Sequence, residues 1–244
     1  MTDRPGQPSP TVELRLLTYN VRGVRAGSPA VARVIGSARP DVVCVQEAPV
    51  ALRWRSRAAD LARRSGLYVV SGGRPAAGNL LLCAARVDVV SAGDHLLSRS
   101  PGLAARGCTA AVLRIGGIDV GVVGTHFGLR ASERRRHAAE VAAIVDQLHE
   151  AGATAVAVAG DLNSAPSAAE WGPLFERLRD TAPNDAPWST YPARAPASRI
   201  DVVLAGPEVV VSACGLVDHV DVSRASDHRP VLAVLQLPVD HRSR

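Results

Sequence analysis

The chain of 244 residues lacks lysine altogether and is poor in aromatic residues, which make up 3% of it. Its 28 basic residues are therefore all arginines, and alanine is abundant, a composition typical of coding bias as much as of selection for a polyanionic partner. The net charge of +5 consequently favours phosphate-bearing ligands only slightly. Scarce aromatics disfavour elaborate recognition of nucleic acid, because bases are commonly stacked on aromatic rings.

Long apolar runs and close cysteine pairs are also missing. No run approaches the roughly 18 to 20 apolar residues that span a bilayer, and residues 1–10 are polar and proline-rich, unlike a signal sequence. The absence of CxxC spacing disfavours zinc, and a disulfide stays open but is less favoured than reduced thiols at Cys44, Cys83, Cys108 and Cys214. We expect a cytoplasmic, monomeric protein without a transmembrane segment.

The apolar content of 47% is enough for a sizeable core, and the length requires no more than one domain. We expect a single catalytic domain over residues 11–238. Residues 1–10 are expected to form a disordered tail, and residues 239–244 a C-terminal tail.

Apolar runs of strand length alternate with helical patterns, and strands outnumber helices. Gly116-Gly117 between two runs indicates the tight turn of an antiparallel hairpin, so a purely parallel sheet is excluded. The clearest strands are expected at residues 12–19, 41–46, 78–84, 108–115, 118–125, 154–159, 200–204 and 230–237.

Three helices are indicated by apolar periodicity and by start signals. Ser28-Pro29 begins the first, Ser132 begins the second, and Ser167 with Glu170 forms a capping box for the third. The third helix is expected to bury Trp171, Leu174, Phe175 and Leu178, and a long loop is expected over residues 183–196. Mixed sheets covered by helices predict a layered sandwich of the α/β class.

Strong polar residues recur beside otherwise apolar strands, in the segments LLTYN, VVCVQE, VVGTHF, AVAVAGDLN, RIDVV and SDHRPVLAVL. Carboxylates in such places are costly unless they are paired, hydrogen-bonded or bound to metal. These junctions come from distant parts of the chain and can converge at one edge of a sandwich. Taken singly, each of these residues is an ordinary turn or strand-end residue, so the joint pattern carries the inference.

The residue types suit phosphoryl chemistry. A hard cation such as Mg²⁺ prefers one or two carboxylates with water and substrate phosphate, which Glu47 and Asp227 can supply. Asp161 and Asn163 in GDLN can hold a nucleophilic water and donate to a phosphate oxygen. His228, oriented by a carboxylate such as Asp201, suits the general base that a phosphodiester requires.

Six segments in this order resemble the signature of the endonuclease/exonuclease/phosphatase superfamily, and the resemblance runs from about residue 12 to residue 237. They are Asn20, QE at 46–47, TH at 125–126, GDLN at 160–163, RID at 199–201 and SDH at 226–228. Any one tripeptide is weak evidence, whereas six in order are strong.

The resemblance implies a four-layer α/β/β/α sandwich of two mixed, mainly antiparallel sheets and a dependence on Mg²⁺ or Mn²⁺. It implies that Glu47 is the principal metal ligand and that Asn20 and Asp227 lie beside the metal. It further implies roles around the scissile phosphate: water alignment by Asp161 and Asn163, a general base His228 oriented by Asp201, and stabilisation of the transition state by His126.

Two departures separate the chain from the family pattern. Some nucleases of the family carry an acid two residues after the asparagine, where this chain has Arg22, which disfavours a second metal. Residues 69–86 contain no acid that could orient His126, which favours His126 as a phosphate contact over a general acid. Arg106 stands where family members often carry an arginine, and a phosphate contact there is left open.

We therefore predict a divalent-metal-dependent phosphoester hydrolase, in which a water activated by histidine attacks phosphorus. Its substrate is a small-molecule, lipid-headgroup or nucleic-acid phosphoester. Two alternatives stay open: a nonspecific nuclease of the same class, and a catalytically silent module that binds a phosphorylated ligand. A serine or cysteine hydrolase has little support, because no GxSxG elbow occurs and Cys44 lies inside an expected strand.

Overall fold

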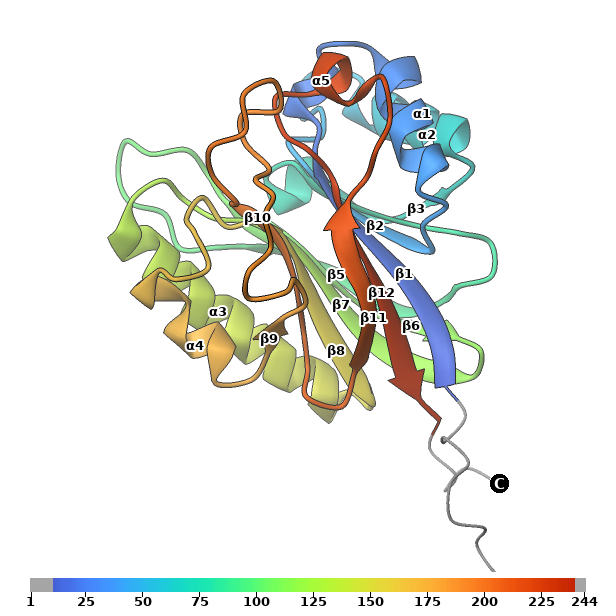
Figure 1. Cartoon of the computed structure of the whole chain (residues 1–244), viewed down its shortest axis with the longest axis vertical. Coiled ribbons are helices and arrows are strands. Elements are labelled where there is room, and N and C mark those ends of the chain that lie inside the picture. The colour runs from blue at the N-terminus through green and yellow to red at the C-terminus, as the bar shows by residue number, and fades with distance from the viewer. Residues whose placement is uncertain (1–10, 240–244) are drawn as a thin grey trace, which may run out of the picture.

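Two six-stranded β-sheets pack face to face, and helices cover their outer faces (Figure 1). The computed structural model describes residues 11–239, so the expected tails lie outside the described residues apart from Val239, which packs against the core. None of the helices within these residues is long and apolar enough to cross a membrane. The predicted four-layer α/β/β/α sandwich is confirmed.

The first sheet has the order β11-β12-β1-β2-β4-β3, and the second has the order β5-β6-β7-β8-β10-β9. In both sheets the successive pairs are antiparallel, antiparallel, parallel, antiparallel and antiparallel. The two sheets thus repeat one pairing scheme that the sequence does not reveal. Their strands are β1 (Thr11–Asn20), β2 (Val42–Gln46), β3 (Tyr68–Gly73), β4 (Asn79–Cys83), β5 (Asp88–Leu96), β6 (Gly107–Ile115), β7 (Ile118–His126), β8 (Ala155–Asp161), β9 (Arg179–Asp180), β10 (Asp201–Ala205), β11 (Val210–Leu216) and β12 (Val231–Pro238).

Helices bridge the two parallel pairs and form the outer layers. The helix α1 (Ser28–Ser37) connects β1 to β2, and α3 (Ala131–Glu150) connects β7 to β8. The remaining helical segments are α2 (Trp54–Ser65), α4 (Gly172–Phe175), α5 (Val222–Ala225) and the 3₁₀ turns η1 (Arg22–Val24), η2 (Arg74–Ala76) and η3 (Ala169–Trp171). The apolar faces of α1, α2 and α5 pack on the first sheet, and those of α3, η3 and α4 pack on the second.

The central core lies between the two sheets and consists of small and branched apolar side chains. Leu14 and Leu16 from β1 meet Val120 and Val122 from β7 there, all of them fully buried. Burial of such side chains stabilises the fold by about 1.5–3 kcal/mol each. The strands are therefore held rigidly in the layer from which the site residues project.

The predicted strands are confirmed to within about two residues at their ends, and so is the Gly116-Gly117 hairpin, since both glycines have positive φ values of 56° and 82°. The prediction for the third helix was wrong in part. The N-cap of the helical segment is Ala168 rather than Ser167, and no side chain caps it. The segment is divided into η3 and α4 at Gly172-Pro173. Phe175 is 41% exposed rather than buried.

Candidate active site

The predicted site residues gather at one end of the sandwich, opposite the end where β1 begins and β12 ends (Figure 1). Asn20, His126 and Asp161 are the last residues of β1, β7 and β8, and Glu47 directly follows β2. Because β1 runs parallel to β2 and β7 parallel to β8, the carboxyl ends of each pair meet at the same edge. The two sheets therefore bring four strand ends together at this end of the molecule.

The Asn20 amide links the two sheets. Its Nδ2 donates to Glu47 Oε1 at 3.2 Å and to Asp161 Oδ2 at 3.0 Å, and the side chain is buried. The Ser226 hydroxyl donates to the Asn20 carbonyl at 2.6 Å, which ties the segment before β12 to the end of β1. Glu47 has a φ of 52°, a left-handed conformation that costs energy and that directs its exposed carboxylate at the strand ends.

His228 and Asp201 form a buried pair on the other side of Asp161. The Nδ1 of His228 lies 3.1 and 2.9 Å from the two Asp201 oxygens, and its Nε2 lies 3.8 Å from Asp161 Oδ2. Burial alone would lower the pKa of His228, but the hydrogen bond with Asp201 and the charges of Asp201, Asp161 and Asp227 raise it to about 9. The carboxylate thus fixes the ring and stabilises its charged form.

His126 has a different environment. Its Nδ1 lies 3.1 Å from an Arg106 guanidinium nitrogen, and because arginine is always a donor, Nδ1 must accept. Its Nε2 therefore carries the proton of the neutral ring and lies 3.4 Å from Asp161 Oδ2, which can accept it. The Asn163 amide nitrogen, 3.0 Å away, is itself a donor and makes no hydrogen bond with Nε2 in this tautomer. Burial, then Arg106 and His228, lower the pKa of His126 well below 6.5. The ring is neutral and can donate through Nε2.

The GDLN loop is held by its own side chains. The Asn163 backbone donates to Asp161 Oδ1 at 3.0 Å, and its side-chain amide donates to the Phe127 carbonyl at 3.0 Å. Asn163 adopts a φ of 53°, which asparagine tolerates better than most residues. Asp161 and Asn163 are consequently held in place by a short loop with fixed geometry.

Arg22 is the departure from the family pattern with the clearest structural consequence. Its Nε lies 3.2 Å from Asp227 Oδ2, so this carboxylate is paired with a guanidinium. Its backbone also donates to Asn20 Oδ1 at 3.1 Å. An unbroken series of contacts thus joins all nine predicted residues, namely Asn20, Glu47, Arg106, His126, Asp161, Asn163, Asp201, Asp227 and His228.

The donor set fits a divalent cation. Hard carboxylate oxygens of Glu47 and Asp161 both accept from the Asn20 amide, and burial followed by the charge of Asp201 raises the pKa of Asp161. A cation would compensate this excess of negative charge. Among the described residues, the acidic and histidine side chains that offer ligand atoms within 4.8 Å of one another are Asp161, Asp201 and His228, without Glu47 or Asp227. A cation among these three would break the Asp201–His228 hydrogen bonds.

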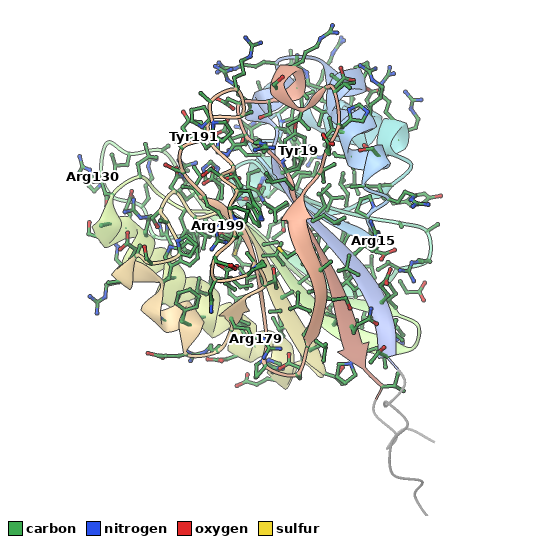
Figure 2. All side chains as sticks on the ribbon, viewed as in Figure 1. Arg15, Tyr19, Arg130, Arg179, Tyr191 and Arg199 are labelled. Atoms are coloured by element: carbon green, nitrogen blue, oxygen red, sulfur yellow. The ribbon has the colours of Figure 1, made fainter. Side chains whose placement is uncertain are left out.

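Two tyrosines at the site were not predicted (Figure 2). The Tyr191 ring lies over His228 with 4.8 Å between ring centroids. Tyr19 is fully buried with its hydroxyl unpartnered within the described residues, and burial, then Asp227 and Asp201, raise its pKa. The only sequence signal for Tyr19 was its position beside Asn20, and Tyr191 lies in the loop at 183–196, where the sequence gives no pattern.

The comparisons with known proteins identify the family of the chain and match its fold. A model of the Endonuclease/Exonuclease/phosphatase family matches residues 17–228. Among solved structures, an endonuclease/exonuclease/phosphatase from Bacteroides vulgatus is 22% identical with a TM-score of 0.77, covering 92% of this chain and 99% of that one. A mannosyl-6-phosphatase from Bacteroides thetaiotaomicron is 19% identical with a TM-score of 0.76, covering 91% and 99%. D. rerio TDP2 complexed with a single-strand DNA product is 16% identical with a TM-score of 0.70, covering 91% and 98%. A comparison with curated proteins finds no match.

Proposed function

Because the chain belongs to the Endonuclease/Exonuclease/phosphatase family, we propose that it is a divalent-metal-dependent phosphoester hydrolase. One observation carries this proposal: the buried His228–Asp201 pair faces Asp161 beside the carboxylates of Glu47 and Asp227. The hydrolysis of a charged ester needs a base, an acid that orients it and carboxylates that bind a cation, all at one place.

In the proposed reaction His228 Nε2 accepts a proton from a water whose oxygen attacks phosphorus, and the bond from phosphorus to the leaving oxygen breaks. Asp201 stabilises the imidazolium that forms, while Asp161 and Asn163 align the water and the phosphate. The Nε2–H of His126 donates to a phosphate oxygen, and Arg106 keeps that ring in the donating tautomer.

We assign Glu47 and Asp227, with Asn20, to a Mg²⁺ ion that Mn²⁺ can replace. When bound, such an ion neutralises phosphate oxygens and offsets the negative charge around His228, which returns the histidine towards its neutral, basic form. The Arg22–Asp227 ion pair supports a single metal, because a guanidinium disfavours a second cation nearby.

The substrate class is a phosphoester. Two of the similar structures are a mannosyl-6-phosphatase and D. rerio TDP2 complexed with a single-strand DNA product, so small-molecule and nucleic-acid esters are both candidates. A nonspecific nuclease is the second candidate within this class, since phosphate contacts alone suffice for it. A silent binding module is less favoured, because binding alone does not require the His228–Asp201 pair.

A substrate panel tests the proposal. Phosphodiesters, phosphomonoesters and plasmid DNA are each incubated with wild-type protein and with His228→Ala, in the presence of Mg²⁺ or Mn²⁺. We expect turnover of at least one class by the wild type and a loss of about 10²–10⁴-fold in the variant. Equal rates for both proteins on every class would refute the proposal, and metal-stimulated binding without product would favour the silent module.

A further inference from the structure

A pocket of about 430 Å³ opens directly beside the site, on the far side of Asp227. Three separate segments line it, namely residues 22–26, 192–194 and 223–227. They lie at the end of the molecule that carries α5, where nitrogen-tipped side chains gather (Figure 2). Asp227 belongs both to this pocket and to the proposed metal site, so whatever fills the pocket lies next to the reacting phosphate.

The pocket has a strong excess of positive charge. Arg22, Arg25, Arg194 and Arg224 line it, and Asp227 is its single acid. Only Arg22 is paired, with Asp227 at 3.2 Å. Within residues 11–239 the other three guanidiniums form no ion pair. The charge of Arg224 helps to lower the pKa of Asp221, but the Asp221 carboxylate is paired with Arg33 at 2.7 Å.

Unpaired guanidiniums that converge on one hollow repel one another unless an anion joins them. The exposed Arg194 donates from its Nε to the Ser223 carbonyl at 3.4 Å, a hydrogen bond that joins two of the segments lining the pocket. Guanidinium is the side chain best matched to phosphate, which it binds through paired N–H donors. The chemistry of the lining therefore indicates a phosphate.

The lining also limits what else can bind. It contains no aromatic side chain, so a base or an apolar ring would find no stacking partner. Alanine, proline and serine complete the walls, which leaves the guanidiniums as the source of specificity. The volume exceeds that of a lone phosphate group and accommodates part of the molecule that carries it.

We propose that this pocket binds a second phosphate of the substrate, separate from the phosphate that is hydrolysed. The inference rests on the proposed hydrolase function and narrows its substrate class to molecules with at least two phosphate groups. The second phosphate can come from a multiply phosphorylated small molecule or from the neighbouring phosphodiester of a nucleic-acid strand. An isolated monoester or diester is consequently a poor substrate.

Two matched substrate pairs test the inference. The small-molecule pair is thymidine 5′-(p-nitrophenyl phosphate) with and without a 3′-phosphate, and the strand pair is a dinucleotide with one phosphodiester and a trinucleotide with two. We expect wild-type kcat/KM to be higher for the doubly charged member of at least one pair. A preference within the first pair alone identifies a small molecule, and a preference within the second pair alone identifies a strand.

The variants Arg25→Ser and Arg224→Ser test whether the preference for the doubly charged substrate depends on this pocket. Each is expected to reduce this preference by roughly three- to tenfold and to leave turnover of the singly charged member unchanged. Arg57→Ser, at an exposed arginine on α2, is the matched control and should keep the preference. Pyrophosphate titrated calorimetrically into the metal-free protein should bind three- to tenfold more weakly to both pocket variants than to wild type or the control.

The outcomes separate the two levels of the proposal. The inference is overturned if wild type turns over both members of each pair with equal kcat/KM, or if the pocket variants keep the wild-type preference and pyrophosphate affinity. Either result leaves the hydrolase function standing. Absence of turnover above the His228→Ala background on these four substrates and on every class of the substrate panel overturns the function and the inference with it. Thermal unfolding of each variant verifies that it is folded.

Discussion

The Nδ1 of His228 lies between the two carboxylate oxygens of Asp201, at 3.1 and 2.9 Å, and both side chains are buried. Asp201 is also the register partner of Asp161, since β10 runs antiparallel to β8 from this pair onward. The same strand pairing therefore sets the orientation of the proposed base and its distance from the acid that aligns the water. Small changes at Asp201 should thus have large effects on turnover.

Asp201→Asn tests the orientation of the base. The amide keeps the volume of the carboxylate but cannot stabilise an imidazolium and can favour the wrong tautomer, so we expect kcat to fall by about 10²–10⁴-fold with KM nearly unchanged. Steady-state kinetics on the substrate found by the panel measure this. Asp88→Asn, exposed on β5 at the opposite end of the sheet, should have no effect. A variant as active as wild type would exclude Asp201 from the mechanism.

The pH dependence of stability follows from the raised pKa of His228 in the metal-free protein. The folded pKa of about 9 exceeds the ordinary 6.5, so the contribution of His228 is fully present below pH 6.5 and is lost as the pH rises through 9. It amounts to at most roughly 3 kcal/mol in the free energy of unfolding. Urea unfolding in EDTA at pH 6.5, 8 and 9 measures the free energy of unfolding of wild type and of His228→Gln. We expect the excess stability of wild type to shrink as the pH rises. A difference between the two proteins that stays constant would contradict the assigned cause.

Arg106→Gln tests whether Arg106 controls the protonation of His126. Removal of the guanidinium takes away a positive charge that lowers the pKa of His126 and the donor that keeps Nδ1 accepting. We expect the pKa of His126 to rise in an NMR titration and kcat to fall by about tenfold, since one hydrogen bond to the transition state weakens. Arg57→Gln should change neither quantity. An unchanged His126 resonance in Arg106→Gln would show that the contact has no electrostatic role.

Much of the fold was predictable because most strands are buried on both faces and read as continuous apolar runs, as β2 and β8 do. The strand β5 was missed because it is an edge strand, exposed along nearly its whole length, and its sequence DVVSAGDHL has no alternation. The helix α2 was missed because it buries only Ala58, Leu61 and Ala62 among many arginines. Main-chain hydrogen bonds and tertiary packing, rather than side-chain pattern, hold these two elements.

The site was predictable as a set of residues but not as a set of contacts. Each predicted residue belongs to a short motif at a strand end, whereas its partners lie far away in sequence. The Arg106–His126 contact spans 20 residues, and the Ser226 hydrogen bond to Asn20 spans 206. Such pairs depend on strand order and register, which the apolar pattern of one strand does not contain.

Gly160→Ala tests the strand register that places His126 beside Asp161. A Cβ at Gly160 would lie 2.1 Å from the Thr125 carbonyl oxygen, which is backbone and cannot move aside without separating β7 from β8. We expect a loss of about 3 kcal/mol or more in the free energy of unfolding. Gly36→Ala, in α1 with nothing within 4 Å of the new Cβ, is the control and should stabilise by about 0.5–1 kcal/mol. Equal urea midpoints for the two variants would contradict this packing.

Titration of Mn²⁺ into the protein, followed by the electron paramagnetic resonance signal of the free ion, tests the central claim most directly. If Glu47, Asn20 and Asp227 hold one cation, wild type binds one ion per chain. Glu47→Gln should weaken binding by at least about tenfold, since a carboxylate ligand loses its charge. Glu150→Gln, at the C-terminal end of α3, should bind as wild type does. Absence of binding, or equal affinity of Glu47→Gln and wild type, would contradict a metal centre at this end of the sandwich.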